Sequence, residues 1–581
     1  MFLLALLLGT ASGRAESSRG VQELSSESGL ATQIRRPVRL LVAGDRIVVG
    51  NRRSGTVSLL ERETAKVFSE HRVATRIADM ALLDASRREI LVLDDAAGEL
   101  RRVRLRDHLP MLHTVTRVPT SAVKLAVARE RRQVFVTAKW SHRLISLTLD
   151  DQSETVSSKE AVDLPFAPQE LLLVHNDETL LVADAFGGRI TVLSVADMRT
   201  LAVRELHGHN IRGLAMSADG KRLHVAHQQM ARHGLADYEE LHWGRFVANG
   251  IQDLDLDEML RADSDDRIDG WLNRQGGIGG ATGDPAGVVT GTVGTGSAGI
   301  TAMAFAGVGE VVIQRAGRER RIEVGERPEA MAIDGDRLYV ANRFADSISI
   351  IDLARQAPVQ TVSLGPSPPL TAADRGEKLF FDARLSHDGW MSCHSCHTDG
   401  HTSGLLVDTL GDGDYGAPKG VPSLLGTRET GPWGWTGSAD SLAEQVRKSV
   451  LTTMHGDDLT DVQTDDLVAY LRSLDAPPPR DREDQELVHQ GGELFESLAC
   501  VDCHSLPRFT SKATFDVGLV DERKRAAFNP PSLRGVGQRE RLFHDGRAKG
   551  IEDVVLTFRH QQGRPLKKEE AAALVAYLRS L

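Results

Sequence analysis

Short runs of apolar residues, broken by turns, fill the first two thirds of the chain and predict β-strands. Residues 38–42, 46–50 and 56–60 each carry Val, Leu or Ile beside polar residues and are separated by turn residues. Comparable units begin near residues 77, 123, 168, 211, 300 and 328, usually at intervals in the forties. Four-stranded units of about 40–45 residues that close on themselves form a β-propeller. We therefore predict a seven-bladed β-propeller over residues 36–365.

Two of these units match closely, at residues 179–193 and 337–351. Both read Leu-x-Val-Ala-(Asp/Asn)-x-Phe, then a turn and a second apolar run, as two strands of one blade would. Leu338-Tyr-Val-Ala-Asn342 resembles the YVTN-type propeller family, which implies a fold and no particular activity.

One unit of the repeat is much longer than the others. It runs from His227 through His233 and His242 into a glycine-rich tract at residues 276–299. We interpret the tract as an extended loop, because no strand-turn-helix context supports nucleotide binding. The three histidines form either a metal cluster or, more simply, scattered polar positions of the loop.

After a proline cluster at residues 364–369 the pattern becomes helical, and this helical part is duplicated. The octapeptide at residues 467–474 recurs identically at residues 574–581. Each half also opens with Gly-x-x-Leu-Phe in a helical setting, at residues 376–380 and 491–495. The repeat predicts two all-α domains, at residues 370–477 and 482–581.

All four cysteines lie in two Cys-x-x-Cys-His boxes, one in each predicted helical domain. The boxes consist of Cys393, Cys396 and His397, and of Cys500, Cys503 and His504. Two thiols at this spacing bond to the vinyl groups of a haem, and the adjacent imidazole coordinates the iron. A four-cysteine zinc site, a redox pair or disulfides are the alternatives, but a zinc site explains neither the histidines nor the distance between the boxes. We therefore predict two cytochrome c domains, each with a covalently bound c-type haem.

Composition and the start of the chain bear on location. The 581 residues are 41% apolar and 26% charged, as in soluble multidomain proteins, and the net charge of −11 argues against nucleic-acid binding. The first nine residues are an apolar run too short to span a membrane, followed by small residues. We interpret residues 1–15 as a signal peptide. Covalent haem attachment also belongs outside the cytoplasmic membrane, so we expect an exported, periplasmic protein without a membrane span.

The last 210 or so residues resemble the di-haem cytochrome c peroxidase family, which includes the MauG-like enzymes. Leu379-Phe-Phe-Asp-Ala-Arg-Leu-Ser386 and Arg541-Leu-Phe-His-Asp-Gly-Arg547 carry the resemblance. It implies a peroxidatic first haem and a second, higher-potential haem that relays electrons. It also implies that Trp435 lies between the haems and serves electron transfer, although an aromatic residue there could equally be ordinary pocket packing.

The first haem departs from the family pattern on its distal side. Where many members have a histidine ligand, this chain has Asp412, a poor iron ligand, so the first iron is expected to be open to peroxide; His401 and Tyr415 are rival ligands. The family's acid–base glutamate aligns with His455, and a histidine can move the protons of peroxide. Three interpretations stay open: His455 is a general base, Met454 or His455 is a sixth iron ligand, or the segment is a surface loop. Only the first gives a peroxidase.

The second haem lacks the usual methionine ligand, since no methionine follows Met454 and Phe558 holds the expected position. His560 is the best remaining axial ligand, with His544 and His489 behind it, and an open second iron is the alternative. The family's interdomain calcium site is doubtful, because residues 539–541 replace one of its elements.

These features together predict an exported di-haem oxidoreductase that reduces hydrogen peroxide or a related small oxidant. A small redox protein would donate the electrons. The alternatives are a MauG-like enzyme that oxidises a partner protein, and a pure electron-transfer protein whose propeller is a docking module. A propeller that itself binds a ligand is a weaker third possibility.

Overall fold

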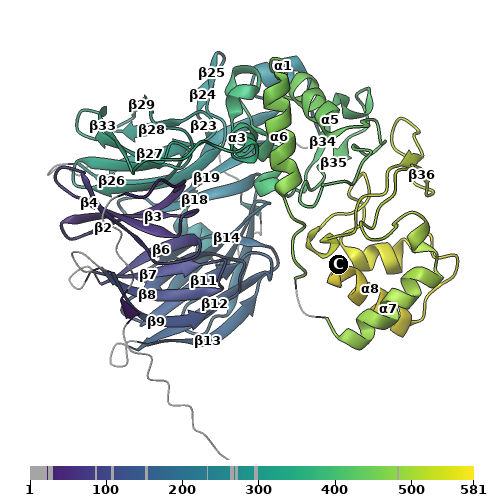
Figure 1. Cartoon of the computed structure of the whole chain (residues 1–581), viewed down its shortest axis with the longest axis horizontal. Helices are drawn as coiled ribbons and strands as arrows, with labels where there is room; N and C mark the ends of the chain where they lie inside the picture. The colour runs from purple at the N-terminus through teal and green to yellow at the C-terminus, as the bar shows by residue number, and fades with distance from the viewer. Residues whose placement is uncertain are drawn as a thin grey trace, which may run out of the picture.

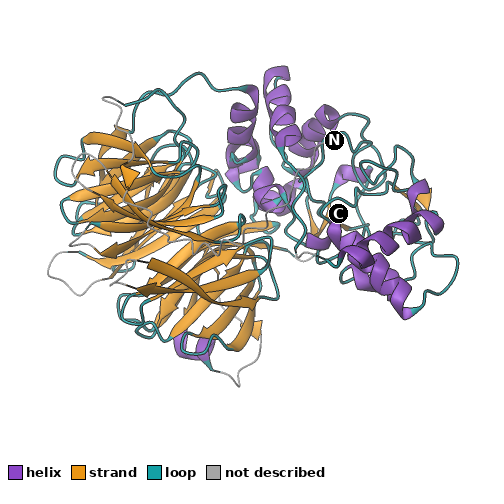
Figure 2. Cartoon of the chain, turned by 60° about the horizontal axis from the view of Figure 1, so that its bottom comes forward, coloured by secondary structure: helices purple, strands orange, loops and turns teal. Residues whose placement is uncertain are grey.

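The computed structural model describes residues 22–23, 30–84, 88–105, 110–150, 155–231, 233–261, 267–268, 272–293, 299–480 and 483–581. A β-propeller from the N-terminal part and a helical C-terminal part lie side by side (Figures 1 and 2). The signal peptide predicted at residues 1–15 lies outside the described residues. None of the described helices combines the length and apolar character needed to cross a membrane.

Seven sheets, each with a core of four antiparallel strands, form the propeller within the described residues. The first four consist of β2 (Pro37–Ala43), β3 (Arg46–Asn51), β4 (Thr56–Glu61) and β5 (Val67–Arg72); β6 (Ile77–Asp84), β7 (Glu89–Asp94), β8 (Glu99–Leu105) and β9 (Pro110–Arg117); β10 (Ala122–Ala128), β11 (Gln133–Ala138), β12 (Arg143–Asp150) and β13 (Thr155–Asp163); and β14 (Pro168–Val174), β15 (Thr179–Asp184), β16 (Arg189–Ser194) and β17 (Thr200–Leu206). The other three consist of β18 (His209–Met216), β19 (Arg222–Met230), β21 (Val247–Asp255) and β23 (Leu272–Arg274); β26 (Pro285–Thr292), β27 (Gly299–Phe305), β28 (Glu310–Arg315) and β29 (Arg318–Glu323); and β30 (Pro328–Asp334), β31 (Arg337–Asn342), β32 (Ser347–Asp352) and β33 (Ala357–Ser363). The first strands of neighbouring sheets adjoin all the way round, from β2 to β30 and back to β2, which confirms the seven-bladed propeller.

Burial explains why the strand patterns differ within a blade. The second strand of the fourth blade, β15, is buried at all six positions, because its two faces pack against neighbouring blades. It therefore reads as a continuous apolar run rather than as an alternation. The outermost strand of the last blade, β33, is mostly exposed, and its sequence mixes polar and apolar residues.

The ring closes without strand exchange between the first and last blades, because β2–β5 and β30–β33 form separate sheets. Instead, the buried carboxylate of Asp346 on the last blade accepts the backbone N–H groups of Arg35 (2.9 Å) and Arg36 (2.7 Å), just before β2. The Arg35 guanidinium, itself fully buried, pairs with Glu70 (2.7 Å) and donates to the carbonyl of Pro366 (2.9 Å). Asp346 and Arg35 thus connect the first blade, the last blade and the exit of the chain.

The sixth blade corrects two predictions. It begins at β26, at Pro285, and not near residue 300, which lies in its second strand. The glycine-rich tract is therefore not one extended loop: it contains β26 and a small hairpin of β24 (Gly276–Gly277) and β25 (Gly280–Ala281). Its glycines hid the strand pattern, but small residues are needed there, because a Cβ on Gly291 would lie 3.1 Å from Ile333 of the next blade.

Two helical units follow the propeller, each with an opening helix that crosses a closing helix. In the first unit α3 (Ala372–Phe380) packs on α6 (Asp461–Ser473), and in the second α7 (Gln485–Ser497) packs on α8 (Lys568–Ser580). The glycine of each Gly-x-x-Leu-Phe motif lies at the crossing, since a Cβ on Gly376 would lie 1.9 Å from the Asp466 carbonyl, and one on Gly491 would lie 2.0 Å from that of Ala573. The duplicated glycine therefore reflects helix packing.

Shorter elements complete the described structure. They are α1 (Tyr238–His242), α2 (Leu256–Leu260), α4 (Cys393–Cys396), α5 (Leu442–Lys448), β1 (Gln22–Glu23), β20 (Gly234–Leu235), β22 (Arg267–Ile268), β34 (Leu406–Asp408), β35 (Lys419–Gly420), β36 (Phe515–Asp516), β37 (Ala527–Phe528), and the single turns η1 (Ala383–Leu385), η2 (His387–Gly389), η3 (Thr398–Gly400), η4 (Leu410–Asp412), η5 (Ser449–Thr453), η6 (Cys500–Asp502), η7 (Val536–Gln538) and η8 (Asp553–Thr557).

Replacing Asp346 by Ala should destabilise the propeller, because two buried backbone N–H groups lose their charged acceptor. We expect the free energy of unfolding to fall by about 2–4 kcal/mol, measured by urea denaturation. The Asp346→Asn variant keeps one acceptor oxygen and should lose less than half as much. Equal stability of wild type and Asp346→Ala would show that other contacts close the ring.

Candidate functional site

The first Cys-x-x-Cys-His box forms the short helix α4 and the turn after it. The N–H of His397 donates to the carbonyl of Cys393 (2.9 Å), which carries the imidazole to the end of the helix. Its Nδ1 lies 2.8 Å from the carbonyl oxygen of Pro422, and burial lowers the pKa of His397 to about 4. A neutral ring that donates from Nδ1 to a carbonyl keeps the lone pair of Nε2 for a metal.

The second box repeats this arrangement on the turn η6. The N–H of His504 donates to the carbonyl of Cys500 (2.9 Å), and its Nδ1 lies 3.1 Å from the carbonyl oxygen of Phe509. Burial, with a smaller contribution from repulsion by His560, lowers the pKa of His504 to about 4. His504 is therefore also a neutral imidazole that is oriented through Nδ1.

The residues of the first box fit a c-type haem. All four cysteines are free thiols, and burial raises the pKa of both Cys393 and Cys396 to about 12. These two thiols and His397 line a cavity of about 910 Å³, which we call the interdomain cavity. Across the described ranges, no cysteine belongs to a group of three or more metal-ligating side chains, as a zinc site would require. Two thiols and an oriented imidazole on one cavity wall are the donor set that covalent haem attachment requires.

The interdomain cavity is bounded by three parts of the chain. The first helical unit supplies most of the wall, including Trp433, Trp435 and Met454. The second unit contributes the segment 538–543, and the propeller contributes Phe186 and the segment 205–209. A ligand in this cavity would therefore touch both helical units and the propeller.

Trp435 lies where the two helical units meet. Its indole N–H donates to the carbonyl of Gly420 (2.8 Å), and its own carbonyl accepts the backbone N–H of Asn529 (2.8 Å) from the second unit. Its ring lies edge-on to His544 with the centroids 6.5 Å apart. Trp435 thus lies at the junction of the two helical units, while its position between two haems and its role in electron transfer stay predictions.

The ring of His455 is bonded to the propeller. Thr453 and Met454 belong to the cavity wall, but His455 does not. The backbone of His455 has φ +49°, and its Nε2 lies 3.0 Å from the carbonyl oxygen of Ala236 in the propeller. The turn after η5 thus directs its ring toward the propeller, while the buried Met454 lies on the wall, and the role of His455 as a general base stays a prediction.

The other proposed ligands of the first iron have partners elsewhere. Asp412 is ion-paired with Arg525 (2.7 Å) and Lys419 (3.3 Å). His401 uses both ring nitrogens, at 2.9 Å from Ser423 Oγ and 3.2 Å from the Gln538 carbonyl, and the hydroxyl of Tyr415 donates to the carbonyl of Ala236 (3.0 Å). These contacts favour Met454 over all three as an iron ligand.

On the second unit, His560 is placed close enough to His504 to lower the pKa of that residue. His560 and Gly456 hold equivalent positions after η8 and η5. The backbone N–H of each donates to the carbonyl of the second residue of the preceding turn. Phe558 thus corresponds to Met454. His544 is buried and stacks on Phe528 (4.1 Å). His489 lies exposed on α7 beside Glu493, so it is not a ligand candidate. The role of His560 as an axial ligand stays a prediction.

A buried arginine lies in the segment 539–541, which replaces an element of the family's calcium site. Arg539 is buried, which lowers its pKa to about 10, and its guanidinium donates to the carbonyls of Ser532 (2.9 Å) and Arg534 (3.3 Å). Carbonyl oxygens that bind a guanidinium are not free for Ca²⁺. Calcium binding by this chain therefore remains without support from the geometry.

The first haem box is fastened to the propeller by a buried polar network that the sequence did not reveal. The carboxylate of Asp284 accepts the hydroxyls of Ser392 and Ser395 (2.7 Å to the latter), which lie before and inside the box. The ring of His209 lies 2.8 Å from the Ser395 carbonyl, and Gln228 donates to the Ser395 hydroxyl (3.0 Å). Burial raises the pKa of Asp284, so this network is costly to leave unpaired.

The loops between the second and third strands of several blades carry the rest of this interface. The Phe of the repeated Leu-x-Val-Ala-(Asp/Asn)-x-Phe motif is part of it: Phe186 lies 4.7 Å from His401, and Phe344 lies 6.0 Å from Phe381, between ring centroids. The motif therefore marks the docking face as well as the blade. An aromatic residue at a repeated loop position was the signal that could have revealed it.

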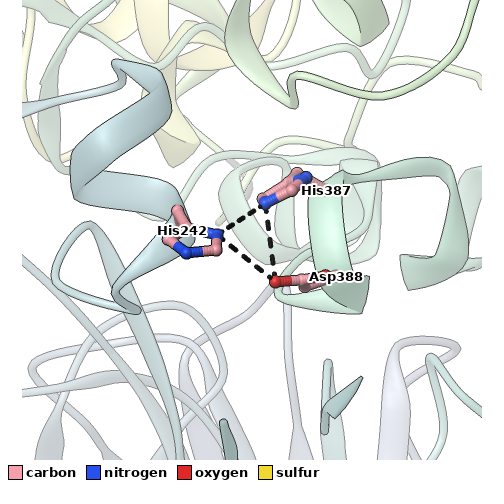
Figure 3. Close-up of side chains that lie close together, drawn as sticks. All are labelled: His242, His387 and Asp388. Carbon is pink, nitrogen blue, oxygen red and sulfur yellow. Dashed lines mark hydrogen bonds and ion pairs between the residues drawn. The ribbon is translucent and has the colours of Figure 1, made fainter. Parts of the chain in front are cut away.

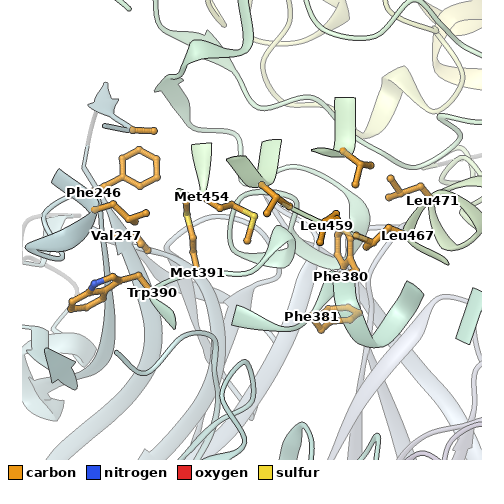
Figure 4. Packing of buried hydrophobic residues seen from close by; sticks show 14 of the residues in the cluster. Phe246, Val247, Phe380, Phe381, Trp390, Met391, Met454, Leu459, Leu467 and Leu471 are labelled. Carbon is orange, nitrogen blue, oxygen red and sulfur yellow. The ribbon is translucent and has the colours of Figure 1, made fainter. Parts of the chain in front are cut away.

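The long fifth unit supplies a second connection. Residues 231–246, which join β19 to β21 and which we call the blade-five insertion, enter the first helical unit. There β20 pairs with β34, and Ala236 accepts from both Tyr415 and His455. Phe246 and Val247 belong to the same buried cluster as Met391 and Met454 (Figure 4). The predicted set His227, His233 and His242 is not brought together, because His227 is buried and bonded to Gln252 (3.0 Å) inside the propeller.

Comparison with known proteins agrees with this geometry. Residues 371–476 match the family described as di-haem cytochrome c peroxidase. The chain is 25% identical over 285 residues to the cytochrome c551 peroxidase of Nitrosomonas europaea, which covers 39% of this chain and 85% of that protein. It is 27% identical over 286 residues to the methylamine utilization protein MauG of Methylophilus methylotrophus, which covers 37% of this chain and 84% of that protein. A structure of Kuenenia stuttgartiensis hydrazine synthase aligns with a TM-score of 0.45 and 15% identity over 56% of this chain and 99% of that one.

The predicted resemblance of the C-terminal part to di-haem peroxidases and MauG is thus confirmed, and these relatives support an oxidoreductase enzyme. The family implies haem as the cofactor.

Replacing both Cys393 and Cys396 by Ala should remove one covalently held haem per chain and leave the other. The two boxes are separate in the structure, and only the first lines the interdomain cavity. Pyridine-haemochrome analysis of denatured, acid-extracted protein should give two haems for the wild type and one for the variant. Equal counts would show that the first box does not attach a haem.

Three buried histidines at the interface between the propeller and the helical units should make the fold sensitive to acid. Burial lowers the pKa of His209 and His142 to about 4 and that of His401 to about 3, below the ordinary value of 6.5. Between pH 6.5 and 4 the unfolded chain binds protons that the folded chain refuses, so stability falls as the pH is lowered, by up to about 1.4 kcal/mol per pH unit for each histidine. Above pH 6.5 these groups contribute no pH dependence.

The variant His209→Gln keeps a donor for the Ser395 carbonyl but cannot titrate. Urea unfolding at several pH values should therefore show a slope smaller by one proton than in the wild type. An unchanged slope would show that His209 is not held neutral at the interface.

Proposed function

We propose that this chain is an exported di-haem c-type cytochrome that reduces hydrogen peroxide, or a related small oxidant, at the first haem site with electrons relayed by the second. The observation that carries the proposal is the matched construction of the two boxes. In each, a neutral histidine is oriented through Nδ1 by a backbone carbonyl, and Trp435 lies at the junction of the two units. The similarity to peroxidases over the same residues supports it.

When bound, a haem at each box supplies redox-active iron, and an iron with an open axial position can bind peroxide. The chain's part is to hold and orient it. Cys393 and Cys396 would carry the covalent bonds of the first haem, and Cys500 and Cys503 those of the second. The carbonyl of Pro422 fixes the ring of His397 and raises the basicity of its Nε2.

The junction between the two units is held rigid by ion pairs, as an electron path requires. Lys419 of the first unit bonds to Asp521 of the second (3.0 Å), and Arg525 of the second bonds to Asp412 of the first (2.7 Å). The carboxylate of Asp521 is buried and shared by both cations. This network keeps Trp435 against the second unit, which supports its proposed role as a relay.

Proton transfer is assigned to His455 with a changed geometry. Because the Ala236 carbonyl can only accept, Nε2 of His455 must carry the proton, so Nδ1 is the atom that can take another. His455 directly follows Met454, which lines the cavity. In this proposal it exchanges protons with peroxide bound in that cavity. Oxidation of a partner protein, as proposed for a MauG-like enzyme, would use the same pocket.

The position of Met454 favours a second candidate function, electron transfer alone. Its side chain is 4% exposed, belongs to the cavity wall, and occupies the place in the first unit that Phe558 occupies in the second. A thioether there could ligate the iron and close it to peroxide. The propeller would then act as a docking module for a redox partner.

Cyanide binding to the oxidised holoprotein separates these two functions. The peroxidase proposal predicts a high-spin component and one equivalent of bound cyanide per chain in the wild type. If Met454 ligates the first iron, cyanide should bind only to the Met454→Ala variant. In that outcome the electron-transfer function would replace the proposal.

Peroxide turnover with an artificial reductant tests His455. The His455→Ala variant should lose at least about tenfold in turnover, as removal of a general acid–base group does, while its haem content stays the same. His489→Ala, which alters an exposed histidine on the second unit, is the matched control. Unchanged turnover in His455→Ala would remove this residue from the mechanism.

A further inference from the structure

Three metal-ligating side chains converge where the propeller meets the first helical unit, outside the interdomain cavity. His242 comes from α1 in the blade-five insertion, and His387 and Asp388 come from η2 (Figure 3). Nδ1 of His242 lies 2.9 Å from Nε2 of His387, and Oδ2 of Asp388 lies 3.6 and 3.4 Å from these two nitrogens. Within the described ranges, these residues are the only group of this kind.

The separations match those within a metal coordination shell. Ligands about 2.0–2.1 Å from a tetrahedral zinc ion lie about 3.3 Å from one another. The three observed separations scatter around this value, so one cation could be bound by all three atoms without rearrangement of the backbone. Each residue would supply a single atom, as imidazole and monodentate carboxylate ligands do.

Hydrogen bonding alone leaves this group incomplete. The two imidazoles can share one proton between their facing nitrogens, but Oδ2 of Asp388 is buried and has no hydrogen-bond partner. Moreover, Asp388 has φ +55°, a conformation that non-glycine residues adopt at some cost. A buried carboxylate oxygen without a donor, held beside two imidazole nitrogens, is suited to bind a cation.

The walls around the group suit a small ion with an open side. The ring of Tyr238 lies 5.6 Å from that of His242 and 4.7 Å from that of His387. The side chains of His242, His387 and Asp388 are 16–24% exposed, so water can reach the site. Three protein ligands and an accessible face leave a coordination position for solvent.

We propose that His242, His387 and Asp388 form a binding site for a divalent transition-metal ion, for which Zn²⁺ is the probe. Two imidazoles select a transition metal over Ca²⁺ and Mg²⁺, which prefer all-oxygen ligands. The site is independent of the haems, and the ion would join the propeller to the haem unit. The backbone N–H of His387 donates to the carbonyl of Met454 (2.9 Å), so the ion would also fix the segment beside the first haem.

The test is Zn²⁺ binding by the chelator-treated, haem-loaded full chain, measured by calorimetry and by elemental analysis after dialysis. The wild type should bind one equivalent of Zn²⁺ and no Ca²⁺, and its melting temperature should rise on zinc addition. His242→Ala and His387→Ala should each bind Zn²⁺ at least tenfold more weakly and lose the thermal shift. The control His175→Asn changes an exposed histidine at φ +51° and should behave as the wild type.

Haem content of each variant reports whether it folds. If His242→Ala loses haem, zinc binding by His387→Ala tests the site instead. If both variants lose haem, zinc binding by Asp388→Asn tests it, because this substitution keeps the shape of the side chain. A wild type that binds no zinc would overturn the proposal. Binding of equal strength in the wild type and in every haem-loaded variant would overturn it as well.

Discussion

The structure depends on one buried carboxylate, that of Asp284, at the point where the propeller meets the first haem box. It accepts hydroxyl groups from Ser392, just before the box, and from Ser395 inside it, while the cysteines and His397 of the box face the interdomain cavity. Because burial disfavours an unpaired charge, the helical unit can dock in only one register without leaving Asp284 unsatisfied. The orientation of a haem held by this box would thereby be coupled to the propeller.

This coupling gives the propeller a function in the haem unit. Its docking face supplies Phe186 and Phe344 from a repeated loop position, and the blade-five insertion supplies Ala236, which binds Tyr415 and His455. A Cβ on Gly244 would lie 2.4 Å from the indole of Trp390, which shows how closely the insertion packs on this unit. The second unit, by contrast, meets the propeller mainly through His142 and Arg189, and its haem box lies away from the interdomain cavity. The two helical units therefore share one fold but differ in their contacts with the propeller.

The architecture could be predicted from local sequence patterns. The blades repeat at intervals of about 45 residues, and the motifs of the two helical units repeat after 107 residues. The Cys-x-x-Cys-His boxes and the Gly-x-x-Leu-Phe helices are local in the same sense. What the sequence could not predict depends on contacts between distant segments, such as β20 with β34 and Asp284 with Ser395. The direction of the His455 ring could not be predicted for this reason: the sequence gives its position along the chain, but the positive φ and the carbonyl of Ala236 decide where its ring points. The strand β26 was missed because its glycines resemble a loop.

The central claim is that the propeller forms part of the first haem site and not of the second. Potentiometric titration of the holoprotein and of its Asp284→Asn variant, followed by the absorption of each haem, tests it most directly. Removing the buried negative charge should raise the reduction potential of the first haem and leave that of the second unchanged. The first haem is identified as the one that is missing from the Cys393→Ala, Cys396→Ala double variant. Identical potentials in wild type and variant, or equal shifts of both haems, would contradict the claim.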